Sequence, residues 1–117
     1  MSYVDGFVAA VPNAKKQEFI DHARAMAEIF KKYGATKVVE NWGVEVPEGE
    51  VTSFSLAVKK QDDETVVFSW VLWPSKQVHD EGWAKIMQDD TMGPDHNPMP
   101  YDGKRIIFGG FETVLEV

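Results

Sequence analysis

The amino-acid sequence predicts an α+β fold of the ferredoxin-like type, in which a βαβ-βαβ chain forms a four-stranded antiparallel sheet with two helices on one face. Two observations lead to this prediction. Segments in which apolar residues alternate or run continuously, as they do in strands, flank two segments in which apolar residues recur at helical spacing. Prolines and glycines lie between these segments, as is typical of turns. At 117 residues, we expect a single domain spanning residues 1–117.

The first half of the chain is predicted to form a strand, a helix and a second strand. Residues 3–11 alternate in the manner of a strand. Asn13 is expected to cap a helix over residues 14–33, because its side chain is able to accept a hydrogen bond from a backbone N–H of the first turn. Gly34 is a typical C-terminal stop. Residues 36–46 are the second predicted strand.

The second half begins with an ambiguous segment. Residues 51–59 fit either a strand or a helical turn, and we favour a short helix. Residues 66–73 are β-branched, aromatic and aliphatic except for one serine, which predicts a strand covered on both faces. Ser75 is expected to cap a second helix, which ends near Asp90.

The rest of the chain is predicted to form a long loop and a last strand. Residues 91–104 contain two glycines and three prolines, which predicts irregular structure. Loops of this length are often functional or mobile, but the sequence assigns this one no role. Residues 105–117 alternate again and form the last predicted strand.

The composition excludes several classes of function. The net charge is −7 and the isoelectric point is about 4.8, which is the wrong sign for a surface that binds phosphates. There is no cysteine, so disulfides and thiolate metal sites are excluded. No apolar run approaches the ~20 residues of a membrane helix. We therefore expect a cytoplasmic protein with no nucleic-acid partner, no membrane partner and no cofactor.

The sheet face opposite the two helices is expected to be strongly apolar. Strand parity, as we assign it, places seven large apolar side chains there: Tyr3, Phe7, Trp42, Val67, Val71, Trp73 and Phe108. So much exposed apolar surface usually marks an interface. A homodimer in which two sheets pack face to face would cover it.

The same assignment places four polar side chains on this open face: Asp5, Glu40, Ser69 and Glu112. Burying an unpaired acid is costly, so these acids need an explanation. Either they line a cavity and one of them takes part in acid–base chemistry, or they have a structural role. In the structural case they sit at strand ends or rims, or pair with Arg105, Lys104 or Lys37 and lock the dimer. Glu40, Glu112 and Asp5 are therefore the candidate catalytic residues.

Aromatic residues and one histidine are the candidates for ligand binding. Trp42, Trp73 and Phe7 lie on the predicted open face, and His96 lies in the long loop, which is free to fold over a cavity. Trp70 and Trp83 are expected to pack in the core, and His22 is expected on the solvated face of the first helix.

Metal binding is not expected. The acidic residues at 89, 90 and 95 and the adjacent histidine match no known metal-binding loop pattern.

Several short segments resemble the YbaA-like family of small bacterial proteins. They are Tyr3-Val-Asp-Gly-Phe7, Val39-Glu-Asn-Trp42, Val66-Val-Phe-Ser-Trp70, Pro74-Ser-Lys76, Asp102-Gly-Lys-Arg105 and Phe108-Gly-Gly-Phe-Glu112. The resemblance covers essentially the whole chain. It implies a fold of the dimeric α+β barrel superfamily, and it brings no established catalytic residues.

Two classes of function remain open from the sequence. The first is a protein that binds a small apolar or aromatic molecule, or acts on one as a cofactor-independent enzyme, in a cavity between the sheet and the helices or the dimer partner. The second is a non-catalytic structural or interaction homodimer without a small-molecule site.

Overall fold

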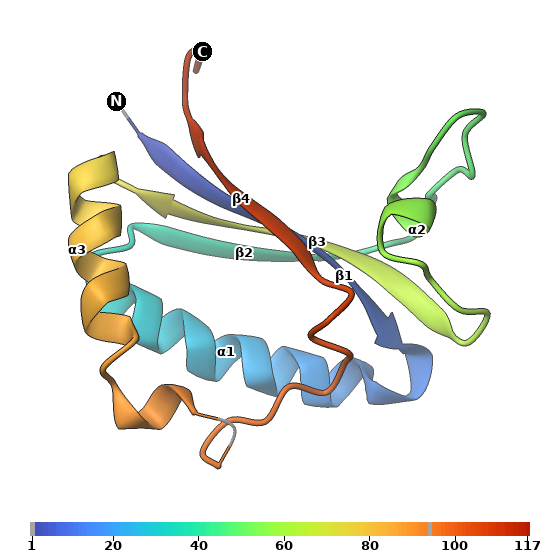
Figure 1. The fold of residues 1–117 in the computed structure, drawn as a ribbon, viewed down its shortest axis with the longest axis horizontal. Helices are drawn as coiled ribbons and strands as arrows, with labels where there is room; N and C mark the ends of the chain where they lie inside the picture. Colours follow the sequence, from blue (N-terminus) through green and yellow to red (C-terminus); the bar gives the residue numbers. More distant parts are fainter. Residues whose placement is uncertain (1, 94) are drawn as a thin grey trace.

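The computed structural model describes residues 2–93 and 95–117 (Figure 1). The elements follow one another as β1 (Tyr3–Pro12), η1 (Asn13–Lys15), α1 (Lys16–Lys32), β2 (Lys37–Trp42), α2 (Phe54–Ala57), β3 (Glu64–Trp73), α3 (Lys76–Ile86), η2 (Asp90–Met92) and β4 (Ile107–Glu112).

The strands form one four-stranded sheet in the order β2-β3-β1-β4, and every neighbouring pair is antiparallel. The two longest strands, β1 and β3, lie in the middle and pair along their whole length. Helices α1 and α3 lie on the same side of the sheet, where both pack against β3 (Figure 1). The predicted ferredoxin-like arrangement of sheet and helices is confirmed.

Local sequence signals account for several element ends. The Ser75 hydroxyl accepts a hydrogen bond from the Val78 backbone N–H at 3.2 Å, as predicted for the cap of α3. Gly34 has a φ of +117° directly after α1, a conformation that stops a helix and suits glycine. The short helix favoured within residues 51–59 is present as α2, and Ser53 caps it.

Three predicted boundaries are wrong. Asn13 begins the η1 turn and its side chain accepts a hydrogen bond from the Thr65 hydroxyl, so it does not cap α1. Strand β2 ends at Trp42 instead of residue 46, and β4 covers only Ile107–Glu112. Glu112 lies opposite Tyr3, the first residue of β1, so the pairing of β4 with β1 ends there.

The predicted orientation of the sheet is also wrong, because the face assigned to the open side faces the helices. Trp73 is fully buried, and its ring meets the edge of the Phe30 ring of α1 at a centroid distance of 6.3 Å. An added Cβ on Gly82 would lie 2.6 Å from the Trp73 ring, so glycine lets α3 approach this tryptophan. Tyr3, Phe7, Val71 and Val38 pack around the same cluster.

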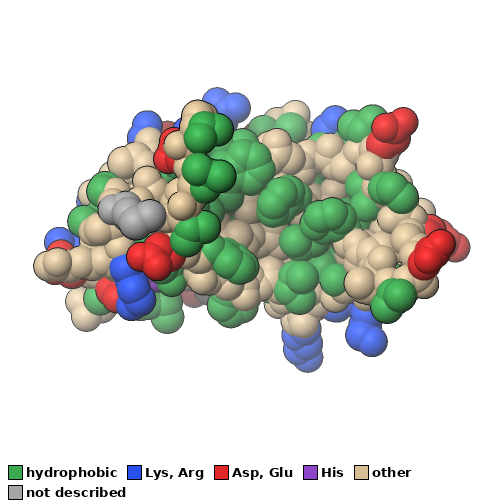
Figure 2. Space-filling view, turned by 90° about the horizontal axis from the view of Figure 1, so that it is seen from above, with side chains coloured by type: hydrophobic (Ala, Val, Ile, Leu, Met, Phe, Trp, Pro, Cys, Tyr) green, Lys and Arg blue, Asp and Glu red, His purple; other side chains and the backbone are tan. Residues whose placement is uncertain are grey.

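The open face therefore carries the side chains of the opposite parity. Phe68 and Phe111 expose 44% and 61% of their surfaces there, although both are large apolar residues. Trp70 lies beside Phe68 on this face, and so does not pack under the helices as predicted. Figure 2 looks onto this face and shows hydrophobic side chains across its middle and charged ones mainly near the rim. Helix α2 covers one end, where its Phe54 packs on Phe68.

Within the described residues, no helix is both long enough and apolar enough to cross a membrane.

Candidate functional site

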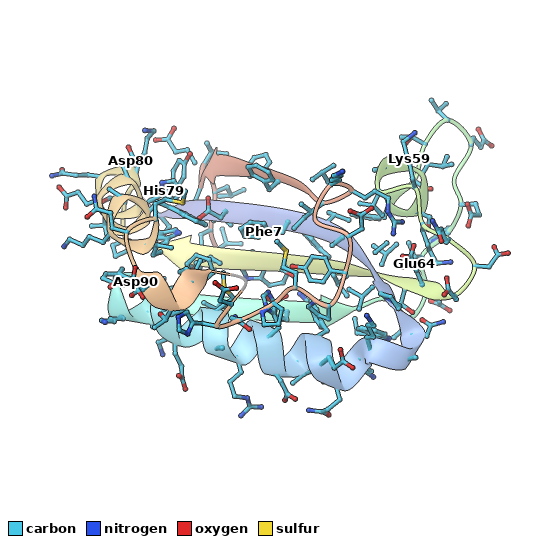
Figure 3. The ribbon with its side chains drawn as sticks, turned by 60° about the horizontal axis from the view of Figure 1, so that its bottom comes forward. Phe7, Lys59, Glu64, His79, Asp80 and Asp90 are labelled. Atoms are coloured by element: carbon cyan, nitrogen blue, oxygen red, sulfur yellow. The ribbon has the colours of Figure 1, made fainter. Side chains whose placement is uncertain are left out.

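A cavity of about 520 Å³ lies between the helix-side face of the sheet, helix α1 and the segment that joins α3 to β4. Figure 3 looks toward this side and shows Phe7 in the middle of the sheet, between α1, α3 and the joining segment. The described residues that line the cavity are Phe7, Ala9, Phe19, His22, Ala23, Met26, Phe30, Glu40, Val67, Ser69, Val71, Trp83, Met92, Asn97, Pro98, Met99, Tyr101 and Ile106.

The walls of the cavity are mainly apolar because two regular patterns meet there. Alternate residues of β1 and β3 form the floor, since side chains on one face of a strand repeat every second residue. On α1, Phe19, Ala23, Met26 and Phe30 recur at helical spacing and form one wall. The segment after α3 supplies Met99 and other side chains that close the far side.

One carboxylate reaches into this apolar space from the edge strand. Glu40 lies directly opposite Ser69 in the β2–β3 pairing, and the Ser69 hydroxyl donates a hydrogen bond to Glu40 Oε2. Glu40 is exposed on the edge strand, and part of its side chain lines the open cavity. Partial desolvation of the carboxyl group raises the pKa of Glu40, and the hydrogen bond from Ser69 opposes the rise in part.

A histidine and an asparagine hold the joining segment against α1. Asn97 Nδ2 donates to the backbone oxygen of His22 at 3.3 Å, so the amide oxygen Oδ1 points to His22 Nδ1, 2.9 Å away. His22 Nδ1 must therefore carry a proton and donate it. Burial lowers the pKa of His22, and the hydrogen bond to Asn97 opposes this. The ring is consequently neutral at pH 7.

Tyr101 completes the polar part of the lining. Burial, and in second place the charge of Glu40, raise the pKa of Tyr101 to about 12. Its ring lies edge-on to His22 at a centroid distance of 6.0 Å. At neutral pH the cavity thus contains a protonated phenol, a neutral imidazole and one carboxyl group whose protonation is sensitive to what binds beside it.

A buried acid, Asp5, lies next to the cavity and serves to hold α3. Asp5 Oδ2 accepts hydrogen bonds from the indole N–H groups of Trp73, at 3.0 Å, and Trp83, at 2.8 Å. Asp5 Oδ1 lies 2.8 Å from His79 Nε2, and His79 Nδ1 lies 2.8 Å from Asp80 Oδ1 (His79 and Asp80 are labelled in Figure 3). Asp5 thereby fixes the Trp83 ring, which forms part of the cavity wall.

The end of the joining segment is anchored by Arg105. Its guanidinium donates to both carboxylate oxygens of Glu64, at 2.6 and 2.8 Å, to Asp102 at 3.1 Å and to the Lys59 backbone oxygen at 3.0 Å. Figure 3 shows Glu64 and Lys59 near each other, away from α3. Among the described residues, Arg105 therefore pairs with Glu64 and Asp102, and not with Asp5, Glu40 or Glu112.

The structure brings together only part of the predicted site. Glu40 and Phe7 line the cavity, and Trp42 packs against its Phe19 wall with a ring-centroid distance of 6.1 Å. Trp73 and Asp5 are buried under α3. Glu112 and His96 are exposed and are not among the residues that line the cavity.

Two titratable residues of the lining were missed by the sequence reasoning. His22 is buried and lines the cavity, so its predicted place on the solvated face is wrong. A signal was present, because His22 follows Phe19 by three residues and precedes Met26 by four, which is the spacing of the apolar stripe. Tyr101 had no such signal, since it lies in an irregular segment.

Among residues 2–93 and 95–117, no three histidine, aspartate or glutamate side chains lie together in a way that would hold a metal ion.

The fold class is supported by a solved relative. The crystal structure of a dimeric ferredoxin-like protein from an uncultured marine organism superimposes on this chain with a TM-score of 0.63, covering 99% of this chain and 98% of the other at 12% identity. That likeness defines the fold alone.

The sequence comparisons identify the family. Residues 2–103 match the family described as "Protein of unknown function (DUF1428)", and the chain belongs to this family. It is 48% identical over 116 residues to the uncharacterized protein YbaA of Escherichia coli strain K12, covering 99% of both chains, and equally similar to YbaA of Shigella flexneri. The resemblance found in the sequence is thereby confirmed.

Proposed function

We propose that this protein binds a small, mainly apolar or aromatic molecule in the cavity between the sheet, α1 and the segment joining α3 to β4. The observation that carries the proposal is the lining itself, in which aliphatic and aromatic walls surround a few converging polar groups. Cavities of this composition, with volumes of about 300–1,000 Å³, are typical of small-molecule sites. The volume of about 520 Å³ lies within this range.

The supporting geometry separates an apolar region from a polar one. Phe30, Met26 and Trp83 offer contact to the body of a ligand, while Glu40 and Ser69 offer hydrogen bonds to one end of it. A bound molecule would bury apolar surface at both partners, which contributes about 25 cal/mol per Å². The polar end would then fix its orientation.

A direct test is isothermal titration calorimetry with 1-naphthol, an aromatic molecule with one hydroxyl group. Ala23 lines the cavity on α1, whereas Ala25 is on the same helix outside the lining. We expect Ala23→Leu to fill part of the cavity and weaken 1-naphthol binding about tenfold or more, a loss of at least about 1.4 kcal/mol. Ala25→Leu should bind as the wild type does.

The result of this comparison decides between the two classes of function. No heat of binding with the wild type, or an equal loss in the two variants, would remove the support for a site in this cavity. Circular dichroism spectra of both variants, recorded first, separate a loss of binding from a loss of folding.

Catalysis at Glu40 is a second candidate, and the raised pKa of its carboxyl group favours it. A carboxyl group with a raised pKa is better suited to transferring protons near neutral pH than an ordinary glutamate is, and it needs no cofactor to do so. Native mass spectrometry of freshly purified protein would reveal a retained ligand. Conversion of that ligand by the wild type but not by Glu40→Gln would support catalysis, and equal conversion by both would exclude Glu40.

We also propose that two copies of the chain associate through the open sheet face. Phe68, Ile107, Phe111 and Leu115 are exposed on or beside this face, and a hollow there is lined by Phe68, Trp70, Leu72 and Phe111. A second copy would cover this surface by a two-fold axis, since the same patch is then used twice. The solved protein with the same fold is described as dimeric.

Light scattering after size-exclusion chromatography tests the association. We expect twice the 13.2 kDa chain mass for the wild type and 13.2 kDa for Phe111→Lys, which places a charge in the middle of the contact. Gln17→Lys, which adds the same charge at an exposed position of α1 on the other side of the sheet, serves as the control. A wild-type monomer at micromolar concentration would refute the dimer. A dimer that binds no 1-naphthol would favour the structural homodimer.

A further inference from the structure

The described residues that line the cavity include one acidic side chain, that of Glu40, and no lysine or arginine. The two other titratable groups of the lining are His22, from α1, and Tyr101, from the segment after α3. Both are neutral at pH 7, because burial lowers the pKa of the first and raises that of the second to about 12. An anionic ligand would therefore meet a carboxylate and no cation.

The carboxylate of Glu40 is held in place and retains an acceptor site. Ser69 is buried and donates to Oε2, which fixes one oxygen against strand β3. No hydrogen-bond donor among the described residues is in contact with the other oxygen, Oε1. Since Glu40 lines the cavity, a ligand with an N–H or O–H group has an oriented acceptor there.

Aromatic side chains line the same cavity as this acceptor. Among the described residues, the lining contains five aromatic rings besides the imidazole of His22. They are Phe7, Phe19, Phe30, Trp83 and Tyr101, from β1, α1, α3 and the segment after α3. The faces of aromatic rings attract cations, most strongly when water is excluded. A net charge of −7 adds a long-range field that raises the local concentration of cations.

We propose that the ligand of this cavity is an amine with an aromatic or apolar body, whose ammonium group pairs with the Glu40 carboxylate while its body packs against the aromatic walls. This inference rests on the proposed small-molecule function and names its ligand class. Neutral alcohols of the same shape bind more weakly, because they lack the charge, and carboxylates are rejected.

The proposal has a defined pH dependence. Because the pKa of Glu40 is raised, its carboxylate in the empty cavity is protonated at a higher pH than that of a free glutamate. An ammonium ligand favours the ionised form, so its affinity rises as the pH rises through the pKa of Glu40 and falls again when the amine itself loses its proton. Protonation of His22 at low pH would also lower the affinity for an ammonium ligand. The pH dependence that remains in Glu40→Gln therefore measures the contribution of His22, and the difference from the wild type measures that of Glu40.

The test compares three molecules of nearly equal size by isothermal titration calorimetry at pH 7.5: 2-phenylethylamine, 2-phenylethanol and phenylacetate. We expect the amine to bind about tenfold more tightly than the alcohol, in line with the greater strength of charge-assisted hydrogen bonds, and phenylacetate to show no binding. In Glu40→Gln the amine should fall to the level of the alcohol, while the affinity for the alcohol changes less than about twofold.

Glu18→Gln is the matched control, because Glu18 is exposed on α1 outside the cavity lining and the change removes the same charge. An equal loss of amine affinity in both variants would overturn the proposal in favour of a long-range field. If Glu40→Gln fails to fold, Glu40→Asp keeps the charge and should retain the preference for the amine over phenylacetate. Loss of that preference in a folded Glu40→Asp protein would also overturn it.

The outcome separates the ligand class from the proposed function. If 1-naphthol binds in the cavity but 2-phenylethanol or phenylacetate binds more tightly than the amine, the cavity remains a site and the amine class is wrong. If neither 1-naphthol nor any of the three molecules binds, the proposed function fails and the ligand class fails with it.

Discussion

Replacing Asp5 by alanine and by asparagine should separate two roles of this buried carboxylate. Its two oxygens accept hydrogen bonds from Trp73 and Trp83 and contact His79. Alanine leaves two indole N–H groups without an acceptor in a buried place, and each such group costs about 1–3 kcal/mol. The His79 side chain is 16% exposed and is able to reach water, so we add nothing for it. The expected loss of unfolding free energy for Asp5→Ala is therefore about 2–6 kcal/mol.

Asparagine should be tolerated better for a geometric reason. Its amide oxygen takes the place of Oδ2 and still accepts from both indoles, while its amide nitrogen faces His79 Nε2. A neutral His79 that donates from Nδ1 to Asp80 is able to accept there through Nε2. What is lost is the charge of the acceptor, about 1 kcal/mol for each retained bond, so we expect Asp5→Asn to cost about 2 kcal/mol.

Urea unfolding followed by far-ultraviolet circular dichroism measures both losses, because this signal comes mainly from the peptide backbone. The slope of the free energy against urea concentration should stay constant across the series. A loss below about 1 kcal/mol for Asp5→Ala, or an Asp5→Asn protein as unstable as Asp5→Ala, would refute this account of the hydrogen bonds.

Three further predictions concern packing and pH. Gly82→Ala should lower the free energy of unfolding by about 1–3 kcal/mol, measured by thermal or urea unfolding. The added Cβ would lie 2.6 Å from the Trp73 ring, so α3 would have to shift. A neutral or stabilising change would show that α3 and Trp73 move apart at little energetic cost. Arg105→Gln should lower the free energy of unfolding at pH 7, because it removes the cation that pairs with the buried Glu64 carboxylate. Arg105 holds the pKa of Glu64 below its usual value, so this contribution is present at neutral pH and is lost as the pH falls through the folded pKa; a cost that stays constant down to pH 3 would contradict the pairing. His22→Gln should lower the free energy of unfolding most above pH 6.5. The folded pKa of His22 is lowered, so the stability that the neutral ring contributes is lost as the pH falls. A difference in unfolding free energy between wild type and variant that grows from pH 7 to pH 5 would contradict this.

Two exposed changes serve as controls for this group. Glu81→Ala, next to Gly82 on the exposed side of α3, and Lys104→Gln, next to Arg105, should each stay within about 0.5 kcal/mol of the wild type.

The order of the elements and several of their ends were determined by the sequence alone. A strand broken by a proline, a helix stopped by Gly34 and a helix capped by Ser75 depend on the conformational limits of single residues and their nearest neighbours. These limits act before the chain is packed. The candidate Glu40 was also found in the sequence, because an acid within an apolar strand needs a special environment wherever that strand lies.

Which face of the sheet meets the helices was decided only by the tertiary structure. Strand β3 is apolar on both faces, so alternation divides its residues into two sets without saying which set is covered. The answer depends on the fit of Trp73 against Phe30 and the glycine at position 82, which come from three different elements. Pairings such as His22 with Asn97, 75 residues apart, are likewise set by how the elements pack, because a side chain takes its partner from whatever the fold places beside it.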